Sequence, residues 1–273
     1  MDIVELLKYL LLGIVQGLTE PLPVSSSGHL VIFQYLLNMN LPGLDFEIIV
    51  NAASLFAIAY YFKNDIKDLV VNNYNFLINK QLKFKKDFRY LLLLVLASIP
   101  AGVIGFLLKG TIETYKSLLM VGLGLLVTGT SLLIVSRLKA KEEIYEEVST
   151  KKAVWIGLAQ SVAILPGVSR SGMTVSMSLK NKLSINEAIK FSFLLFIPIS
   201  LASFILSGFE IISNPVAGLS YLGLGIAFVA SLITTYYALK IFVKVLKKQK
   251  LGYFSIYCFV VGLAAILFHF IEL

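Results

Sequence analysis

Six long apolar segments without charged side chains are the feature that most constrains how this chain can fold. They cover residues 48–62, 90–108, 117–136, 191–209, 215–239 and 251–268. Most of them approach or reach the roughly 20 residues that a helix needs to cross the hydrocarbon core of a bilayer. The mean hydropathy of +0.85 and the 15% share of charged residues lie far outside the range of soluble domains. We therefore expect an all-α polytopic membrane protein, and not a very apolar soluble protein.

Lysine and arginine are concentrated in three of the connectors between these segments. The net charge of +8 could indicate a nucleic-acid partner, but the basic residues cluster in 63–89, 137–152 and 240–250. The connectors 109–116 and 208–216 carry few of them. This alternation is the positive-inside pattern of a multi-pass membrane protein. It predicts that the three basic connectors are cytoplasmic, that both termini lie outside, and that the charges contact membrane lipids and no nucleic acid.

Two further features of the sequence narrow its class. The N-terminal stretch MDIVELLKYLLLG lacks a basic region and a small-residue cleavage site, so we expect it to belong to the mature protein. Cys258 is the single cysteine and lies inside an apolar segment. No disulfide and no cysteine-based metal site is therefore expected, and Cys258 is interpreted as a packing residue.

A polar stretch near the N-terminus is repeated later in the chain. GIVQGLTEPLPVSSSG, residues 13–28, aligns without a gap with GLAQSVAILPGVSRSG, residues 157–172, at an offset of 144. All but one of the six identities are glycines or polar residues, which makes a duplication the favoured explanation. The predicted first repeat covers residues 1–145 and the second covers 146–273.

Each repeat is expected to begin with a re-entrant helix–loop–helix and to continue with three transmembrane helices. The two re-entrant hairpins are placed at about 3–38 and 153–180. Such a unit crosses the membrane an odd number of times, so the second repeat must have inverted topology. Non-helical backbone at membrane depth is tolerated where protein buries it or where it lines a cavity. The two loops are therefore expected to meet near the midplane, where inverted-repeat proteins commonly bind their ligands.

Two charged residues fall within these hairpins. Glu20 is the only acidic or basic residue between positions 9 and 37, and Arg170 is the only charged residue between 153 and 179. An ionisable group inside a membrane is costly, so each is a candidate functional residue. A structural ion pair that holds the two repeats together is the alternative interpretation.

The residues around Glu20 and Arg170 suit the binding of a phosphate ester. Backbone N–H groups at the start of each second half-helix can bind an anion, and the Arg170 guanidinium can contact phosphoryl oxygens through two donors. A glycine at position 167 lets the backbone approach a ligand closely. The residues predicted to contact a diphosphate are Ser25, Ser27, Gly167, Ser169, Ser171 and Thr174. Helix capping alone is the simpler explanation for the serines.

The first hairpin also carries candidate catalytic groups. Ser26 and His29 lie three residues apart and are interpreted as a nucleophile and its proton partner. Ser26 is singled out because it aligns with Arg170 at the offset of 144. The carboxylate of Glu20 and the amide of Gln16, one helical turn earlier, can hold a divalent cation, Mg²⁺ or Ca²⁺, against phosphate oxygens.

These motifs resemble the undecaprenyl-diphosphatase (bacitracin-resistance) family of integral membrane phosphatases. The matching stretches are Gln16–Glu20, Leu22–His29 and Pro166–Thr174, and the resemblance extends over essentially the whole chain, including SIPAGVIGFLL at 98–108. Gln16 stands where the family has glutamate or glutamine, and Ser27 stands where threonine is also common.

The resemblance implies removal of one phosphate from undecaprenyl diphosphate at the outer face of the plasma membrane, with a divalent cation, which recycles the lipid carrier of cell-wall synthesis. The implied partners are a polyprenyl diphosphate, membrane lipids and, in a homodimer, a second copy of the chain. Whether the serine or the histidine attacks the substrate is left open. A polyprenyl-phosphate flippase or transporter is the alternative function, because inverted repeats with broken helices are also transporter architecture.

Overall fold

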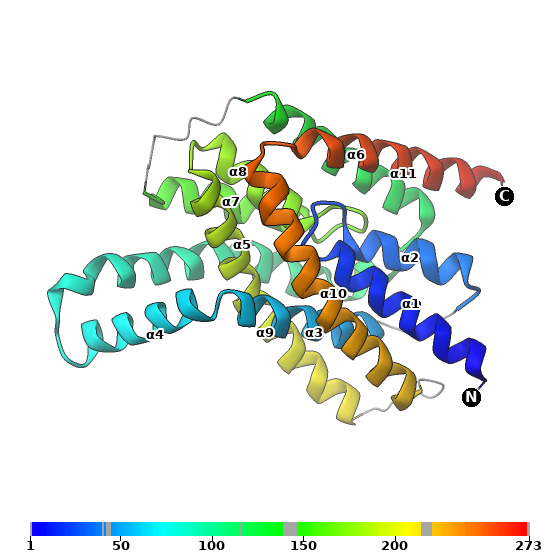
Figure 1. Ribbon diagram of the computed structural model, residues 1–273, viewed down its shortest axis with the longest axis horizontal. Coiled ribbons are helices and arrows are strands. Elements are labelled where there is room, and N and C mark those ends of the chain that lie inside the picture. The colour runs from blue at the N-terminus through cyan, green and yellow to red at the C-terminus, as the bar shows by residue number, and fades with distance from the viewer. Residues whose placement is uncertain are drawn as a thin grey trace.

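The computed structural model describes residues 2–39, 41, 45–114, 116–138, 147–213 and 220–271, with the side chains of 45, 109–114 and 207–213 excepted. Within these ranges every element is a helix (Figure 1). The elements are α1 (Ile3–Thr19), α2 (Ser26–Leu36), α3 (Asp45–Tyr61), α4 (Lys63–Leu77), the 3-10 helix η1 (Leu82–Phe84), α5 (Lys85–Thr114), α6 (Leu118–Ser136), α7 (Thr150–Val162), α8 (Arg170–Lys180), α9 (Ile185–Ser213), α10 (Tyr221–Lys247) and α11 (Leu251–Ile271).

Five described helices are long and apolar enough to cross a membrane, namely α5, α6, α9, α10 and α11. A sixth candidate is α3 together with α4, which are bent by 74° relative to each other. The six apolar segments of the sequence fall on α3, α5, α6, α9, α10 and α11, apart from Phe62, Ser117 and Ser220, which adjoin helix ends, and from 215–219, which lie outside the described residues. The predicted all-α polytopic membrane class is confirmed.

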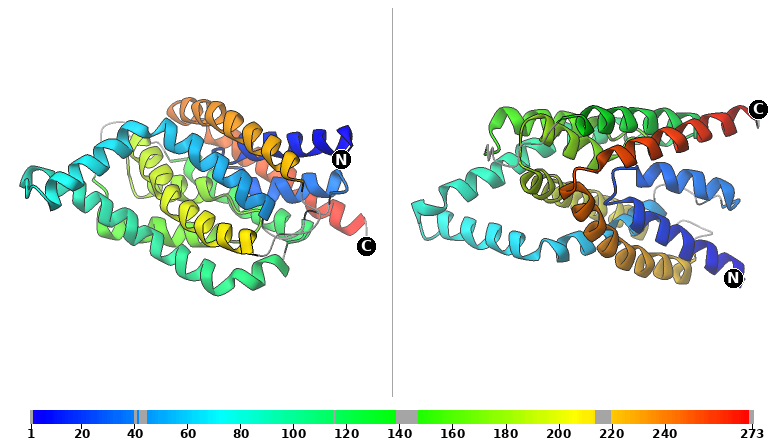
Figure 2. Two further views of the ribbon diagram at one scale, coloured as in Figure 1. Left: turned by 90° about the horizontal axis from the view of Figure 1, so that it is seen from below. Right: turned by 45° about the horizontal axis from the view of Figure 1, so that its top comes forward.

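The basic connector 63–89 is mostly helical, which the sequence analysis did not predict. α4 and the first turns of α5 form a hairpin that projects from the rest of the molecule (Figure 2). Its two helices are joined by the rings of Phe76 and Phe88, which stack with centroids 4.9 Å apart. The segment contains no glycine or proline, and Ile66 and Leu69 pack on the main core. Apolar residues at this spacing stabilise a helix even among many polar neighbours.

The two polar stretches form similar helix–loop–helix units, α1 with α2 and α7 with α8. α2 and α8 both have 11 residues, and they begin at Ser26 and Arg170. Each is capped by the preceding serine, whose side chain accepts a hydrogen bond from the N–H of the glycine at the third position of the helix. The capping hydrogen bond is therefore repeated at the start of α2 and α8, although the backbone differs at the two serines, with a φ of 67° at Ser25 and −79° at Ser169.

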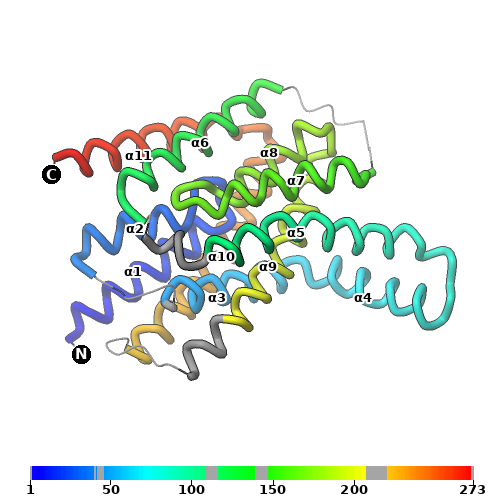
Figure 3. The backbone as a smooth tube through the Cα atoms, turned by 180° about the vertical axis from the view of Figure 1, so that it is seen from behind, coloured from blue at the N-terminus to red at the C-terminus, as the bar shows by residue number. Residues whose placement is uncertain are grey.

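Each unit packs closely on a helix from the other part of the chain. α1 lies along α10, and α7 lies along α5 (Figure 3). A Cβ atom on Gly13 would lie 2.3 Å from the carbonyl oxygen of Ala227, and one on Gly157 would lie 2.5 Å from that of Ala97. Glycine is needed at both crossings, as in other close membrane-helix contacts. α1 of the predicted first repeat thus packs on α10 of the second, and α7 of the second packs on α5 of the first, as expected for two related halves. The inverted topology stays a prediction, as does the boundary at 145, which lies outside the described residues.

The chain ends lie at one end of the molecule. Figures 1 and 2 show the start of α1 and the end of α11 close to that end, and the turn between α4 and α5 at the opposite end. The termini and the basic α4–α5 hairpin therefore lie at opposite ends of the long axis. The charge pattern predicts this arrangement, because it places the termini and the basic connectors on opposite sides of the membrane.

Candidate active site

The loops of the two helix–loop–helix units are in direct contact. Ser171 Oγ donates a hydrogen bond to the Leu22 carbonyl oxygen at 3.0 Å, and a Cβ on Gly28 would lie 3.1 Å from the Gly167 Cα. Gly167 has a φ of +84°, and a Cβ there would lie 2.1 Å from the Val121 carbonyl oxygen. Only glycine tolerates both that backbone conformation and that proximity. The contact brings Glu20 of the first loop to Arg170 of the second.

Glu20 lies at the centre of the contacts between the two loops. Its Oε1 atom forms an ion pair with Nη2 of Arg170. Its Oε2 atom accepts hydrogen bonds from Ser26 Oγ at 2.5 Å and from Gln16 Nε2 at 2.9 Å. The Glu20 side chain is buried, so the pairing with a cation and two neutral donors compensates for its lost hydration. Four of the residues singled out from the sequence are therefore in one hydrogen-bonded cluster.

Arg170 is held by α9 as well as by Glu20. Its Nη1 atom donates to Ser200 Oγ at 3.1 Å, and its guanidinium carbon lies 3.7 Å from the centroid of the Phe196 ring. Phe196 and Ser200 are one helical turn apart, on the two sides of Pro198. Neither residue could be singled out from the sequence, because both lie in an apolar span without a charge. The only local signal in the sequence is the order of these residues, with a proline between an aromatic residue and a serine that are one helical turn apart.

One serine in each loop caps the helix that follows it. Ser25 Oγ accepts a hydrogen bond from Gly28 N at 3.2 Å, and Ser169 Oγ accepts one from Gly172 N at 3.1 Å. Ser25 Oγ and Ser27 Oγ lie 3.4 Å apart. The capping role proposed as the simpler explanation is therefore present at Ser25 and Ser169. These caps also fix where the N–H groups at the start of α2 and α8 point.

Two threonines complete the second loop. Thr128 of α6 accepts a hydrogen bond from Ser169 N at 2.9 Å and donates to the carbonyl oxygens of Gly124 and Gly167 at 3.1 and 3.3 Å. Thr174 Oγ1 donates to the Arg170 carbonyl oxygen at 2.9 Å. Thr128 was not predicted to belong to the site, since it lies in a span and its hydrogen bonds join backbone atoms of the loop and of α6.

His29 is buried, and its ring does not hydrogen-bond to Ser26. Its Nδ1 atom lies 2.8 Å from the Ser25 carbonyl oxygen, and its Nε2 atom lies 2.7 Å from the hydroxyl oxygen of Tyr257 in α11. The two rings are stacked at 7°, with centroids 5.6 Å apart. Both ring nitrogens are therefore already engaged, and Ser26 is joined to Glu20 instead. Tyr257 was missed by the sequence analysis because it lies in the last apolar segment.

The donor atoms around Glu20 fit a divalent cation that arrives with a phosphate ligand. Within the part of the chain that the structure describes, no group of three or more His, Cys, Asp or Glu side chains could hold a metal ion. Glu20 and Gln16 supply one carboxylate and one amide. Mg²⁺ is often bound by one or two carboxylates together with substrate phosphates, so this pair can serve as the protein's share of the coordination.

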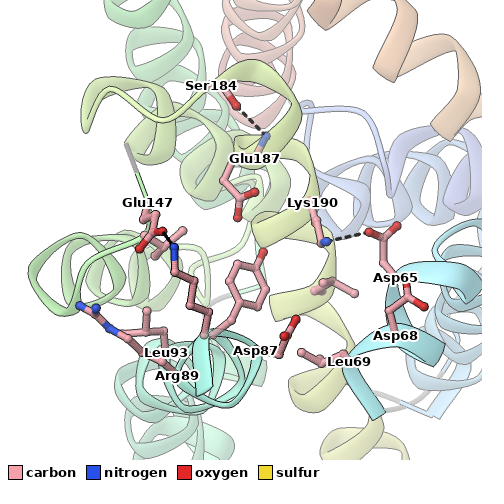
Figure 4. Close-up of a pocket in the computed structure, with 14 residues that line it drawn as sticks. Asp65, Asp68, Leu69, Asp87, Arg89, Leu93, Glu147, Ser184, Glu187 and Lys190 are labelled. Atoms are coloured by element: carbon pink, nitrogen blue, oxygen red, sulfur yellow. Dashed lines mark hydrogen bonds and ion pairs between the residues drawn. The ribbon is translucent and has the colours of Figure 1, made fainter. Parts of the chain in front are cut away.

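Two cavities in the structure lie away from this cluster. One, of about 380 Å³, lies between α4, α5 and the start of α9 and contains the ion pairs Lys86–Glu147 and Lys190–Asp65, both at 2.8 Å (Figure 4). The other, of about 430 Å³, lies beside the end of α2. Neither is lined by Glu20, Ser26, His29 or Arg170. The loops are closed on each other in this structure.

Comparison with known proteins gives one consistent result. The family described as Bacitracin resistance protein BacA matches residues 9–264. Undecaprenyl-diphosphatase 1 of Bacillus licheniformis is 44% identical over 270 residues, which cover 98% of this chain and 100% of the relative. Undecaprenyl-diphosphatase 1 of Bacillus cereus is 42% identical over 263 residues (96% and 97%), and the undecaprenyl-diphosphatase of Oceanobacillus iheyensis is 40% identical over 266 residues (96% of each). The matched region contains both loops and every residue of the cluster, and the chain belongs to the bacitracin resistance protein BacA family.

Proposed function

We propose that this protein is an integral membrane phosphatase that hydrolyses undecaprenyl diphosphate to undecaprenyl phosphate and inorganic phosphate, and so recycles the lipid carrier of cell-wall synthesis. Family membership and the names of relatives that match over nearly the whole chain support this function. The single structural observation that carries it is the convergence of a buried carboxylate, a hydroxyl and a guanidinium from two loops that are far apart in sequence. These are the groups that phosphoryl transfer requires.

Binding of the diphosphate is assigned to Arg170 and to the starts of α2 and α8. A guanidinium binds phosphoryl oxygens through paired N–H donors, and Arg170 can exchange Glu20 for the substrate. The N–H groups near Ser27 and Ser171 add donors at two helix N-termini, where the helix dipole also favours an anion. Ser25, Ser169 and Thr174 hold these segments in place through the hydrogen bonds described above.

The chemical step is assigned to Ser26. Its oxygen attacks the distal phosphorus, its proton passes to the Glu20 carboxylate to which it is hydrogen-bonded, and the bond to the bridging oxygen breaks. Undecaprenyl phosphate leaves, and water then cleaves the phosphoserine, which releases inorganic phosphate and restores Ser26. His29 lies three residues further along α2 as the second group that can carry a proton, and it is the alternative nucleophile.

A divalent cation, Mg²⁺ or Ca²⁺, is part of this proposal. Glu20 and Gln16 would hold it beside the phosphate oxygens, where it would neutralise phosphoryl charge. Glu20 Oε1, which pairs with Arg170 in this structure, is the carboxylate oxygen that becomes available when Arg170 binds the substrate. The cation and the diphosphate are therefore expected to favour each other's binding.

The protein is a multi-pass membrane protein, and its orientation is part of the proposal. We infer that both termini and the opening of the site face outward, and that the connectors 63–89, 137–152 and 240–250 are cytoplasmic. The distribution of lysine and arginine supports this orientation, as does the position of the two chain ends opposite the α4–α5 hairpin (Figure 1).

The flippase or transporter alternative is not favoured, because transport requires no nucleophile hydrogen-bonded to a buried carboxylate. Purified protein in detergent, where no second compartment exists, separates the two functions. The expected result is release of inorganic phosphate from undecaprenyl diphosphate in the presence of Mg²⁺ or Ca²⁺. A preparation that binds the lipid but releases no phosphate under any cation condition would overturn the proposed function.

A further inference from the structure

We propose that Tyr257 is a positioning residue of this site, which fixes both the orientation and the tautomer of the His29 imidazole. The inference rests on the proposed phosphatase function only where it concerns turnover. The hydroxyl of Tyr257 lies 2.7 Å from His29 Nε2, although the two residues are separated by 228 positions and come from the last helix and the first hairpin.

The tautomer of His29 follows from the chemistry of its two partners. The Nδ1 atom lies 2.8 Å from the Ser25 carbonyl oxygen, which can only accept a hydrogen bond, so Nδ1 carries a proton. In the neutral imidazole Nε2 then has a lone pair and no proton, and the Tyr257 hydroxyl donates to it. Within the described residues the Tyr257 hydroxyl is the hydrogen-bond partner of Nε2, so without it no hydrogen bond would favour this arrangement at Nε2.

The Tyr257 ring is held firmly enough to act as a positioning group. α11 packs along α6, and Ser255 Oγ donates to the Gly129 carbonyl oxygen at 2.7 Å. The neighbouring Cys258 is completely buried, and its Sγ lies 3.6 Å from the Pro23 carbonyl oxygen in the first loop. The part of α11 that carries Tyr257 is therefore tied both to α6 and to the loop that precedes Ser26.

Tyr257 also covers the one nitrogen through which His29 can exchange a proton. His29 is 3% exposed and its Nδ1 is committed to a carbonyl, whereas Tyr257 is 43% exposed. A phenolic hydroxyl can donate or accept, so it can serve the neutral ring and, after rotation, the protonated ring. Among the described hydrogen bonds, the Tyr257 hydroxyl is therefore the group through which His29 Nε2 can exchange a proton with its surroundings.

The sharpest test is the Tyr257→Phe variant, because it removes the hydroxyl and keeps the stacked ring. Tyr253→Phe is the matched control: Tyr253 lies one turn earlier on α11, is 65% exposed, and its one described contact is with Lys250. The chain has 2 histidines, so ¹⁵N spectra of histidine-labelled protein in detergent micelles contain two imidazoles, and His269→Gln assigns them.

We expect the wild-type protein and Tyr253→Phe to show His29 with a protonated Nδ1 and a hydrogen-bonded, unprotonated Nε2. Tyr257→Phe should shift the His29 Nε2 resonance or mix the two tautomers. Unchanged His29 resonances in Tyr257→Phe would overturn the proposal. This measurement does not depend on turnover, so it remains decisive even if the protein proved not to be a phosphatase.

The second measurement is the kinetics of phosphate release. Tyr257→Phe should lower kcat by about tenfold or more while KM changes little, since a misplaced acid or base affects the chemical step. In a His29→Ala background the same substitution should cause no further loss, because Tyr257 acts through His29. Multiplicative losses in the double variant, or equal losses in Tyr253→Phe, would show a structural role of α11 and contradict positioning of His29.

Discussion

Glu20 and Arg170 form an ion pair across 150 positions of the sequence, and the same Glu20 carboxylate holds the hydroxyl of Ser26. The pair therefore joins the two loops and also positions the carboxylate that binds Ser26. Breaking a buried pair by removing one partner typically costs about 3–5 kcal/mol, because the other charge is left without compensation. An inactive variant at either position must consequently be tested for folding before its loss of activity is assigned to chemistry.

Arg170→Lys separates the chemical role of Arg170 from its structural role. Lysine keeps the positive charge beside Glu20 but loses the planar, two-pronged contact with phosphoryl oxygens. We expect thermal unfolding close to that of the wild type and a loss of phosphate release on the order of 10²-fold or more. Near-normal turnover would favour the interpretation of Arg170 as a structural counter-ion.

The proposed orientation can be tested with single cysteines in a Cys258→Ala background. Lys80 lies in the turn between α4 and η1, and Asp2 lies at the start of α1, at the other end of the molecule. An impermeant thiol reagent added to intact cells should label Asp2→Cys and should label Lys80→Cys only after permeabilisation. Labelling of Lys80→Cys in intact cells would contradict the topology.

The sequence predicted the spans and the charged centre for physical reasons that are local. Long apolar segments have few structural alternatives, and Glu20 and Arg170 stand out because charges inside a membrane are costly. Gln16 could be placed beside Glu20 from helical spacing alone.

Other residues of the site could not be predicted from the sequence, because only the tertiary packing of the helices brings them to it. Tyr257, Phe196 and Ser200 lie in apolar spans, and nothing near them in sequence indicates which helix they face. In this structure Ser26 is hydrogen-bonded to Glu20, while the ring nitrogens of His29 lie next to Ser25 and Tyr257. The pairing of Ser26 with His29 in the reaction stays a prediction. Helix α4 was missed because its polar residues obscure the apolar spacing that docks it on the core.

The contact between the two loops requires glycine at position 167. Gly167→Ala introduces a Cβ 2.1 Å from the Val121 carbonyl oxygen, at a φ of +84°. The backbone conformation alone costs about 1–2 kcal/mol for a residue with a side chain, and relief of the clash must separate the loop from α6. We expect a lower unfolding temperature and strongly reduced turnover. Gly102→Ala is the control, since outside its own turn of helix nothing lies within 4 Å of a Cβ there, and an equal effect would contradict the packing explanation.

The roles of Ser26 and Glu20 predict different responses to the divalent cation. Ser26→Ala removes the nucleophile, so turnover should be lost at every Mg²⁺ or Ca²⁺ concentration, while the lipid can still bind through Arg170. Glu20→Gln keeps the shape of the side chain but removes the charge that would hold the cation, so the concentration needed for residual activity should rise. Ser136→Ala is the control, because its hydroxyl donates to the Leu133 carbonyl oxygen at 2.8 Å at the end of α6 and belongs to neither loop.

Phosphate release by the three variants across a cation titration is the measurement that distinguishes these roles. Full activity in Ser26→Ala would remove the serine from the chemical step and leave His29 as the attacking group. If Ser26→Ala is inactive and Glu20→Gln needs the same cation concentration as the wild type, Glu20 would be assigned to proton transfer from Ser26 and not to the cation. Since Glu20 Oε2 already accepts the Ser26 hydrogen bond at 2.5 Å, that outcome would assign the carboxylate to this contact alone.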